Sequence, residues 1–292
     1  IFPFLLDETS KTKTTKMSMS FYVNQLKYIL SFELDKKRIY SETLTVYESI
    51  RPTKLYSRSY DPYTDSSVIE FGINLKMAKK NQDTIAGNTI NNCSVLAAFG
   101  NCNVGKTKLN DVYDYFAKQV KDVLAPGMLL SGYVKRHLDK DKDGNLKKFI
   151  LNFLKDSDFN IEDVTLHEEE ELITPELEQL IQKAPIADDA KSEMLKKGKI
   201  TNTELTFTHR TGNGLYELSE EYESNGTMRF LGMAIILNFL LKNNQFVPID
   251  EVETSIHYEL LSYFIKVFLA NSNQTSQMLL TTHDINLLNE EF

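Results

Sequence analysis

Phe246-Val247-Pro248-Ile249-Asp250-Glu251 is the stretch on which the prediction of the fold depends. A short apolar run that ends in two adjacent carboxylates is typical of a buried strand whose carboxyl end opens into a site. Because side chains alternate along a strand, Asp250 and Glu251 are expected to point to different sides. One carboxylate can then hold Mg²⁺ through water, while the other orients or deprotonates an attacking water.

Segments on either side of this stretch add two features that suit a nucleotide. Upstream, Ser224-Asn225-Gly226-Thr227 precedes apolar residues at helical spacing, so a small polar segment opens a helix. The free backbone N–H groups and the positive end of the dipole at such a position suit a phosphate. Downstream, residues 277–282 predict a second buried strand, and His283 stands at its end beside Asp284.

Four segments, taken in chain order, resemble the motifs of ABC-type ATPases. They are similar to the signature motif, the Walker B strand, the D-loop and the switch histidine: residues 224–227, 249–251, 253–257 and 281–284. More narrowly, the chain resembles the bacterial ABC-type AAA ATPases grouped with the SMC, RecF and OLD proteins, many of them in anti-phage defence operons. The order of the four motifs is much more specific than any one of them. The resemblance is strongest over residues 218–292 and weaker over residues 3–47 and 148–164.

This resemblance implies an α/β fold, with an ABC-type P-loop NTPase core, an antiparallel β-meander lobe and a helical arm. We therefore expect residues 1–92 to form the β-rich lobe and residues 93–203 to form a helical arm or insertion. Residues 204–292 are expected to form the ATPase core, with the signature, Walker B, D-loop and switch histidine.

The resemblance also implies ATP and Mg²⁺ as cofactors. Asp250 would support the Mg²⁺, and two residues would be catalytic: Glu251 by polarising water and His283 by sensing or stabilising the γ-phosphate. The signature residues would bind the nucleotide held by a neighbouring protomer: Ser224, Asn225, Gly226 and Thr227. We therefore expect a homodimer or higher oligomer that closes on ATP and opens after slow hydrolysis.

Three functions remain open for such a switch. The leading one is a defence-type ATPase that holds or releases an effector protein, such as a nuclease or another toxin. The second is a DNA-repair or chromosome-maintenance ATPase of the SMC/RecF type that binds DNA directly. The third is a nucleotide-binding scaffold that hydrolyses little or no ATP.

Composition narrows the class of protein. The chain has 292 residues, 41% of them hydrophobic, and can bury a substantial core. A net charge of −8 argues against an obviously basic nucleic-acid binder and is compatible with a local basic groove. Two cysteines, Cys93 and Cys102, indicate a reducing compartment and no structural zinc. No apolar run approaches membrane-spanning length, so we expect a soluble, cytoplasmic protein without a membrane partner.

Residues 100–107 match the phosphate-loop pattern G-x-x-x-x-G-K-[ST] in full. In a true phosphate loop, Lys106 would neutralise phosphate charge and Thr107 would ligate Mg²⁺. The alternative is a chance match in a Lys/Asn-rich loop between two helices. We favour the alternative, because a β-meander precedes these residues, whereas in the family the phosphate loop comes before the meander. The functional loop would then precede Ile1, and the sequence would be part of a longer chain.

Other segments carry structural predictions. Alternating apolar residues over residues 17–47 predict an antiparallel meander with one wet face. Residues 164–203 are highly charged and predict an exposed helical arm, with helix starts at Thr174-Pro175 and Asp188. Pro248 has no N–H to donate, so we expect either a local irregularity in its strand or a neighbour that stops short of it.

Overall fold

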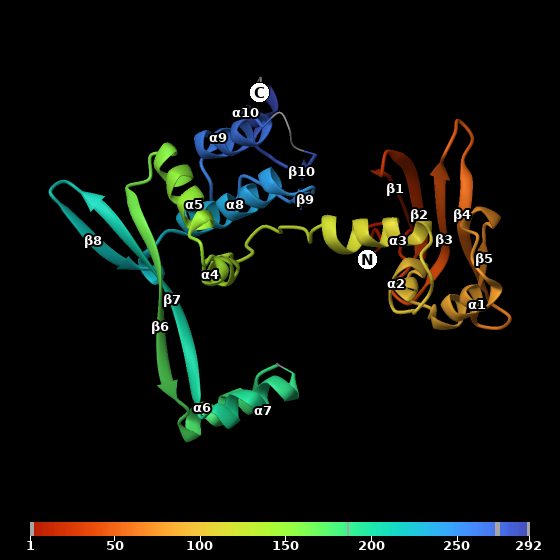
Figure 1. The fold of residues 1–292 in the computed structure, drawn as a ribbon, viewed down its shortest axis with the longest axis horizontal. Coiled ribbons are helices and arrows are strands. Elements are labelled where there is room, and N and C mark those ends of the chain that lie inside the picture. The colour runs from red at the N-terminus through yellow and green to blue at the C-terminus, as the bar shows by residue number, and fades with distance from the viewer. Residues whose placement is uncertain (1–2, 186, 272–274, 291–292) are drawn as a thin grey trace. The chain divides into compact units, whose positions relative to one another are not determined.

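The computed structural model describes residues 3–185, 187–271 and 275–290. The chain divides into two compact units, Ile1–Val120 and Lys121–Phe292 (Figure 1). Together they form a mixed α/β fold with antiparallel sheets and helices. In the described part of the chain, no helix has both the length and the apolar character needed to cross a membrane.

The first unit is built on a five-stranded antiparallel meander with neighbouring strands paired in chain order. Its strands are β1 (Thr15–Val23), β2 (Leu26–Leu34), β3 (Ile39–Tyr47), β4 (Thr53–Asp61) and β5 (Ser66–Phe71). The β1–β2 connection is a two-residue turn in which Asn24 and Gln25 have φ values of 50° and 66°. Positive φ at both central residues matches the right-handed twist of the flanking strands. The predicted meander is confirmed.

Helices cover one face of the meander and complete the first core. They are η1 (Ile73–Leu75), α1 (Lys79–Asn88), α2 (Val95–Gly100), α3 (Lys108–Asp114) and the π-helical turn η2 (Tyr115–Gln119). Leu44 and Tyr56 of the sheet and Ile85, Phe99 and Val112 of the helices are buried in one cluster. The hydrophobic effect of joining these faces is the main term that stabilises this unit.

A fully buried ionic network ties the helices to the sheet. Arg58 is 2% exposed and Glu42 0% exposed, and their side chains lie 4.0 Å apart. Arg58 donates to the backbone carbonyls of Ile90, Asn91 and Cys93, while Glu42 accepts from the Val95 N–H and the Tyr56 hydroxyl. Burial raises the pKa of Glu42, against the opposing effect of these hydrogen bonds and of Arg58. The connection before α2 is therefore fixed to β3 and β4 from inside the core.

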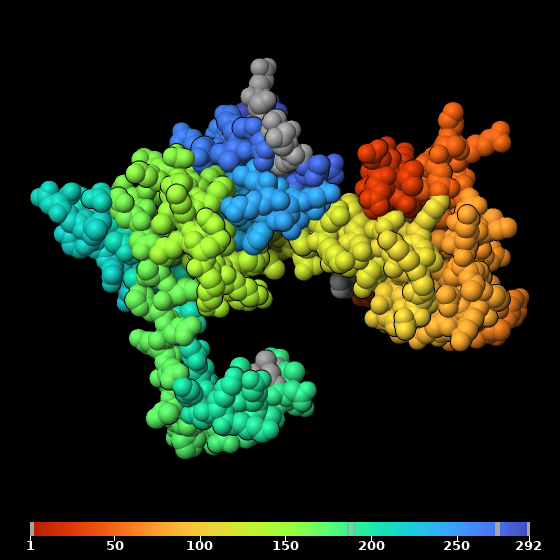
Figure 2. Space-filling model, in the orientation of Figure 1, coloured from red at the N-terminus to blue at the C-terminus, as the bar shows by residue number. Residues whose placement is uncertain are grey.

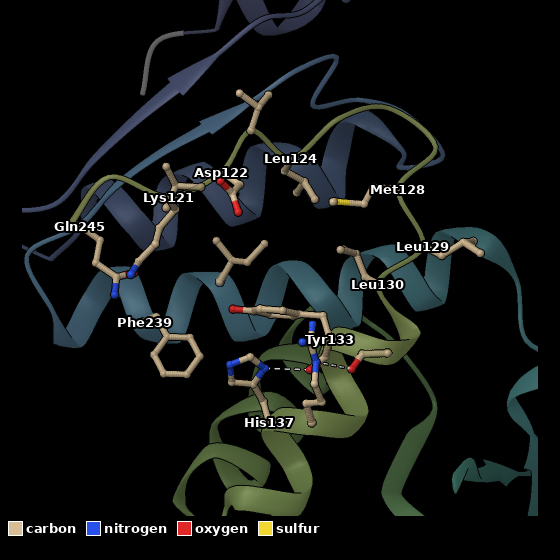
Figure 3. Close-up of a pocket in the computed structure, with 15 residues that line it drawn as sticks. Lys121, Asp122, Leu124, Met128, Leu129, Leu130, Tyr133, His137, Phe239 and Gln245 are labelled. Carbon is tan, nitrogen blue, oxygen red and sulfur yellow. Dashed lines mark hydrogen bonds between the residues drawn. The ribbon is translucent and has the colours of Figure 1, made fainter. Parts of the chain in front are cut away.

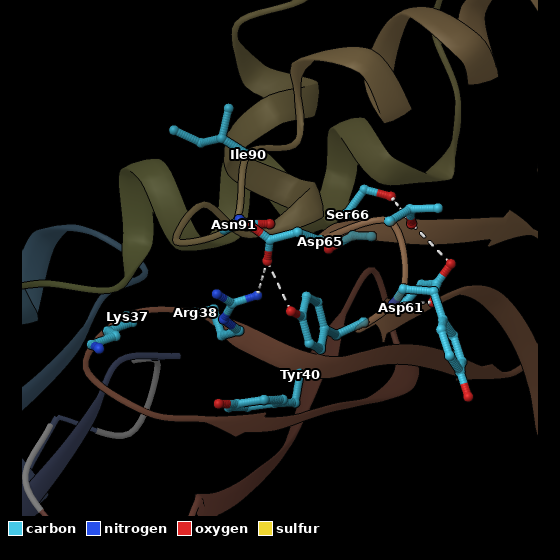
Figure 4. Close-up of polar contacts among 12 residues, drawn as sticks. Lys37, Arg38, Tyr40, Asp61, Asp65, Ser66, Ile90 and Asn91 are labelled. Atoms are coloured by element: carbon cyan, nitrogen blue, oxygen red, sulfur yellow. Dashed lines mark hydrogen bonds and ion pairs between the residues drawn. The ribbon is translucent and has the colours of Figure 1, made fainter.

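A second polar cluster lies at the surface, where β3 begins, β4 ends and β5 begins (Figure 4). The Asp65 carboxylate accepts hydrogen bonds from Arg38 at 2.6 Å and from the Tyr60 hydroxyl at 2.8 Å. The Arg38 guanidinium also lies over the Tyr60 ring, 4.2 Å from its centroid. These hydrogen bonds lower the pKa of Asp65 and hold the β4–β5 turn, where Asp65 has a φ of 48°.

The Gly100–Thr107 segment connects two helices. A phosphate loop needs a strand before it, but here α2 precedes the segment and α3 follows it. Thr107 caps α3 in a capping box with Asn110, and Lys106 is exposed. The local structure therefore supports the interpretation as a chance match to the phosphate-loop pattern.

The second unit is organised around the long helix α8 (Asn225–Lys242), which is buried on almost all sides. Around it lie α4 (Ser131–Lys140), α5 (Asn145–Asp156), α9 (Tyr258–Leu269) and α10 (Ile285–Asn289). Phe230 of α8 stacks against Phe153 of α5 and against Phe159, with ring centroids 5.0 and 5.4 Å apart. A close approach of Leu130 to Gly232 leaves no room for a Cβ at that position.

An arm projects from this unit (Figure 2). Its structure differs from the expected helical arm. Its stem pairs β6 (Ile161–Leu172) with β7 (Lys199–Thr211), and β8 (Gly214–Ser219) extends the sheet at its base. Only its tip is helical, with α6 (Pro175–Lys183) and α7 (Asp188–Lys197), which begin where the sequence predicts. The acidic residues 168–171 are exposed, as expected, but they lie in β6, where alternation places them on both faces of a solvated ribbon.

The strand of the opening stretch is β9 (Phe246–Ile249), and it pairs in parallel with β10 (Gln277–Leu280). On its other side, Phe246 accepts from the Lys121 N–H, and Pro248 accepts from the Leu124 N–H. Three residues of this segment thus span two residues of β9. The extra residue lies between these two hydrogen bonds, next to the position where Pro248 has no N–H to donate. Neither expected alternative describes this arrangement, because β9 pairs in register with β10 through Pro248 and the irregularity lies in the neighbouring segment.

The division into two units falls at Val120. Helices α2 and α3 therefore pack with the meander, and α8 packs with the elements that follow Lys121. The assignment of residues 1–92, 93–203 and 204–292 to the β-rich lobe, the arm and the ATPase core stays a prediction about function.

We predict that Arg58→Met lowers the free energy of unfolding by about 3 kcal/mol or more, because it leaves the Glu42 charge and three carbonyls without their buried partner. Urea unfolding followed by circular dichroism measures this loss. Arg51→Met, at an exposed position, is the matched control and should change stability by no more than about 0.5 kcal/mol. Equal midpoints for the two variants would contradict the prediction.

Candidate active site at the ends of β9 and β10

The backbone turns sharply immediately after β9. Glu251 has a φ of 45° and Ser255 a φ of 62°, in the left-handed region that is unfavourable for residues with a Cβ. Each such residue costs about 1–3 kcal/mol and persists only where its surroundings hold it. Hydrogen bonds from the Thr254 N–H to Glu251 and from the Ile256 N–H to Glu253 close the loop, which leads into α9. Strain of this kind is concentrated at functional sites.

Thr281 holds this turn from the end of β10. Its hydroxyl accepts from the Glu251 N–H at 2.8 Å and donates to Asp250 Oδ1 at 2.5 Å. Its carbonyl accepts from the Val252 N–H at 3.1 Å. One threonine therefore fixes the direction of the Asp250 carboxylate and the backbone of Glu251 and Val252.

His283 lies beside the carboxylates, as the sequence predicts. Its Nε2 is 3.8 Å from Glu251 Oε1, and the side chains of His283 and Glu251 are 84% and 45% exposed. Because β9 and β10 are parallel and end in register at Ile249 and Leu280, the segments after them emerge at the same edge. The structure thus brings Asp250, Glu251 and His283 together at one accessible place.

Glu253 positions the histidine segment through its side chain. Glu253 Oε1 accepts from the His283 N–H at 2.7 Å. Partial burial raises the pKa of Glu253, but hydrogen bonds from the His283 N–H, its own N–H and the Thr282 hydroxyl outweigh this and hold the pKa below its ordinary value. The carboxylate is therefore a charged acceptor that fixes the start of this segment.

The expected signature segment forms the start of α8. Ser224 is the N-cap, and its hydroxyl accepts from the Thr227 N–H at 2.9 Å. Ser224 and Asn225 are exposed, whereas Thr227 is buried. A Cβ on Gly226 would lie 2.6 Å from the Ser255 carbonyl oxygen, so only glycine allows this contact between the segment and the loop after β9.

The structure does not join this segment to the carboxylates. Among the described residues, no hydrogen bond or ion pair links Ser224, Asn225, Gly226 or Thr227 to Asp250, Glu251 or His283. The segment instead touches the same loop from another side, through Gly226 and Ser255. Its exposed residues are free to meet a ligand held elsewhere.

Polar contacts also fix the chain just before α8. Glu220 pairs with Lys135 of α4, and Glu223 pairs with His209 of β7. The Ser219 hydroxyl donates to Glu204 of β7. Strand β7 at the base of the arm is therefore bonded to the residues that immediately precede Ser224.

The donor set at the site suits Mg²⁺ in one specific way. Mg²⁺ in nucleotide sites is held by one or two carboxylates, with waters and phosphate oxygens as the other ligands. Asp250, oriented by Thr281, can supply one such oxygen. In the described parts of the chain, no group of three or more His, Cys, Asp or Glu residues could enclose a metal. The residues therefore fit a metal shared with a phosphate ligand better than a cage made by the protein.

A separate cavity of about 790 Å³ lies between α4, α8 and residues 121–130 (Figure 3). Tyr133, His137 and Phe239 form an aromatic group on its wall, with His137 Nδ1 2.8 Å from the Tyr133 carbonyl oxygen. None of Asp250, Glu251 and His283 lines this cavity. The candidate site is therefore based on the convergence of charged groups at the ends of β9 and β10 and not on the size of a cavity.

Sequence reasoning missed the roles of Thr281 and Glu253, although both lie inside the recognised motifs. The available signal for Thr281 was its position near the end of the second predicted strand, residues 277–282. Glu253 has the weaker signal, because its contact with His283 spans 30 residues and depends on how the loop folds.

We predict that Glu251→Gly raises the free energy of unfolding by about 1 kcal/mol relative to Glu251→Ala, because glycine adopts the left-handed backbone without strain. Both variants remove the carboxylate, so their difference isolates the backbone. Thermal unfolding followed by circular dichroism measures it. Identical melting temperatures would show that Glu251 is not strained in solution.

A comparison with models of known protein families gives a match over most of the chain. Residues 1–289 match the family model described as "AAA domain, putative AbiEii toxin, Type IV TA system". No curated protein matches the chain. The family match confirms the resemblance to AAA-type ATPases of the ABC and defence class, and it supports nucleotide binding. Since the match extends over almost the whole sequence, the chain belongs to this family of AAA domains.

Proposed function

We propose that the protein is an ATPase that works as a nucleotide-gated dimeric switch. The observation that carries the proposal is the meeting of Asp250, Glu251 and His283 at the accessible ends of β9 and β10. A carboxylate that can bind a metal, a second carboxylate that can orient water and a histidine that can donate to a phosphate oxygen suit the hydrolysis of a phosphoanhydride. Membership of an AAA family supports the same chemistry.

The residues would divide the work as follows. Asp250, held by Thr281, would bind Mg²⁺, which when bound supplies charge neutralisation at the phosphates. Glu251 would accept a hydrogen bond from the attacking water and orient it. His283, 3.8 Å from Glu251, would donate to an oxygen of the γ-phosphate. The strained backbone at Glu251 would keep its carboxylate directed at the water.

The start of α8 would act on the nucleotide of a second copy. Ser224 and Asn225 are exposed at the N-terminus of an 18-residue helix, where free N–H groups and the helix dipole favour an anion. Since no contact joins these described residues to the carboxylates of the same chain, we propose that ATP is held between two protomers. Hydrolysis would remove the ligand that favours the closed pair.

We further propose that the switch controls an effector, such as a nuclease or another toxin, in anti-phage defence. The family description names a toxin of a type IV toxin–antitoxin system, which supports control of a partner protein. The alternatives are an ATPase that acts on DNA directly and a scaffold that binds nucleotide without turnover.

We predict that Glu251→Gln lowers ATP turnover by at least about 100-fold while ATP stays bound, because the amide cannot orient or deprotonate water. Turnover is measured as released phosphate, and retention as nucleotide recovered with the purified protein. Glu259→Gln, at an exposed position of α9, is the matched control.

Unchanged turnover together with unchanged nucleotide retention in Glu251→Gln would contradict the catalytic proposal and favour the scaffold. DNA binding that weakens steeply with salt would favour the DNA-directed alternative. A second polypeptide that co-purifies and leaves after ATP hydrolysis would support the effector.

A further inference from the structure

Arg229 is a buried cation that lacks a partner. It lies on α8, five residues after the N-cap Ser224, and is 5% exposed. None of its three guanidinium nitrogens has a hydrogen-bond partner. Burial lowers the pKa of Arg229, and the charge of Glu253 opposes this effect. A buried charge without a partner costs several kcal/mol, so the arrangement needs an explanation.

Glu253 has a buried carboxylate oxygen that also lacks a hydrogen-bond partner. Its Oε1 holds the His283 N–H, but its Oε2 is buried without a partner. In the described part of the chain, five buried side-chain polar atoms lack a partner, and four of them belong to Arg229 and Glu253. The buried Arg229 and the partly buried Glu253 therefore interact electrostatically, yet they form no hydrogen bond.

The contact between α8 and the loop after β9 provides a way to bring the two groups together. Gly226 packs against the Ser255 carbonyl, so a shift of the first turns of α8, which carry Arg229, would also displace the loop that carries Glu253. The same turns present Ser224 and Asn225 to solvent, where the proposed nucleotide would bind. Ligand binding at the helix start can thus change the distance between Arg229 and Glu253.

We propose that Arg229 is a positioning residue that pairs with Glu253 when nucleotide engages the start of α8, and that this pair fixes the His283 segment for hydrolysis. The inference rests on the proposed function and adds to it a link from the signature segment to the histidine. The free Oε2 of Glu253 accepts from Arg229, while Oε1 keeps the His283 N–H. His283 is therefore positioned for hydrolysis only after the α8 start of one protomer has engaged the nucleotide held by the other.

A purely structural role predicts a different behaviour. If Arg229 only filled space, methionine would replace it without loss, because a buried unpaired charge is unfavourable and an apolar side chain of similar length is not. If Arg229 pairs with Glu253, methionine at position 229 removes this ion pair, whereas lysine retains the positive charge that the ion pair needs.

The experiment measures hydrogen exchange of the full-length protein by mass spectrometry, with and without a slowly hydrolysed ATP analogue. In the wild type, the analogue should slow exchange in residues 224–228 and also in residues 281–284. In Arg229→Met and in Glu253→Gln, the analogue should still slow exchange in residues 224–228. Residues 281–284 should exchange about tenfold faster than in the wild type with the analogue bound. Arg229→Lys should retain protection in both segments.

Turnover gives the second readout. Arg229→Met should lower kcat by about tenfold with little change in KM, and the double variant with Glu253→Gln should be no slower than either single variant. Arg210→Met, which removes an exposed ion pair with Glu162, is the control and should behave as the wild type. Glu253→Gln, at a half-buried position, keeps the test decisive if Arg229→Met does not fold.

The inference is overturned if Arg229→Met shows the wild-type protection of residues 281–284, or if the two substitutions act additively on kcat. Failure of the proposed function is distinguishable, because the analogue would then protect neither segment in the wild type. That result would overturn both the proposed function and this inference.

Discussion

The site depends on the hydrogen bonds that the Thr281 side chain makes across the ends of two parallel strands. Its hydroxyl accepts from the Glu251 N–H and donates to Asp250, so one hydroxyl group positions both the backbone and a carboxylate. A typical hydrogen bond contributes only about 0.5–1.5 kcal/mol, and one to a charged group about 1.5–3 kcal/mol. Together these are of the size needed to hold Glu251 in its unfavourable conformation.

The surrounding fold makes this arrangement possible. The pairing of β9 with β10 brings residues 30 positions apart to the same edge, and α8 presses Gly226 against the loop that follows β9. The elements that carry the proposed chemistry are short, because β9 and β10 have four residues each. Their positions therefore depend on the packing of α8 and α9, which are longer and deeply buried.

Much of this architecture could be predicted from residue patterns, where the pattern and the local structure coincide. The meander follows from alternation, and α8 follows from apolar spacing after a Ser N-cap. The stem of the arm could not be predicted, since four consecutive glutamates show neither helical nor strand periodicity and pairing with β7 decides their structure. The roles of Thr281, Glu253 and Arg229 depend on contacts between distant segments, which a single sequence does not reveal.

The central claim is that each nucleotide is held by the carboxylates of one copy and the α8 start of another. Mixing two inactive variants tests it directly: Glu251→Gln, which removes the water-orienting group, and Asn225→Asp, which adds a negative charge where phosphate should bind. After subunit exchange, half of the dimers are mixed and each contains one intact site. We therefore expect the mixture to recover about a quarter of wild-type turnover. A mixture no more active than the two variants measured separately would contradict the account.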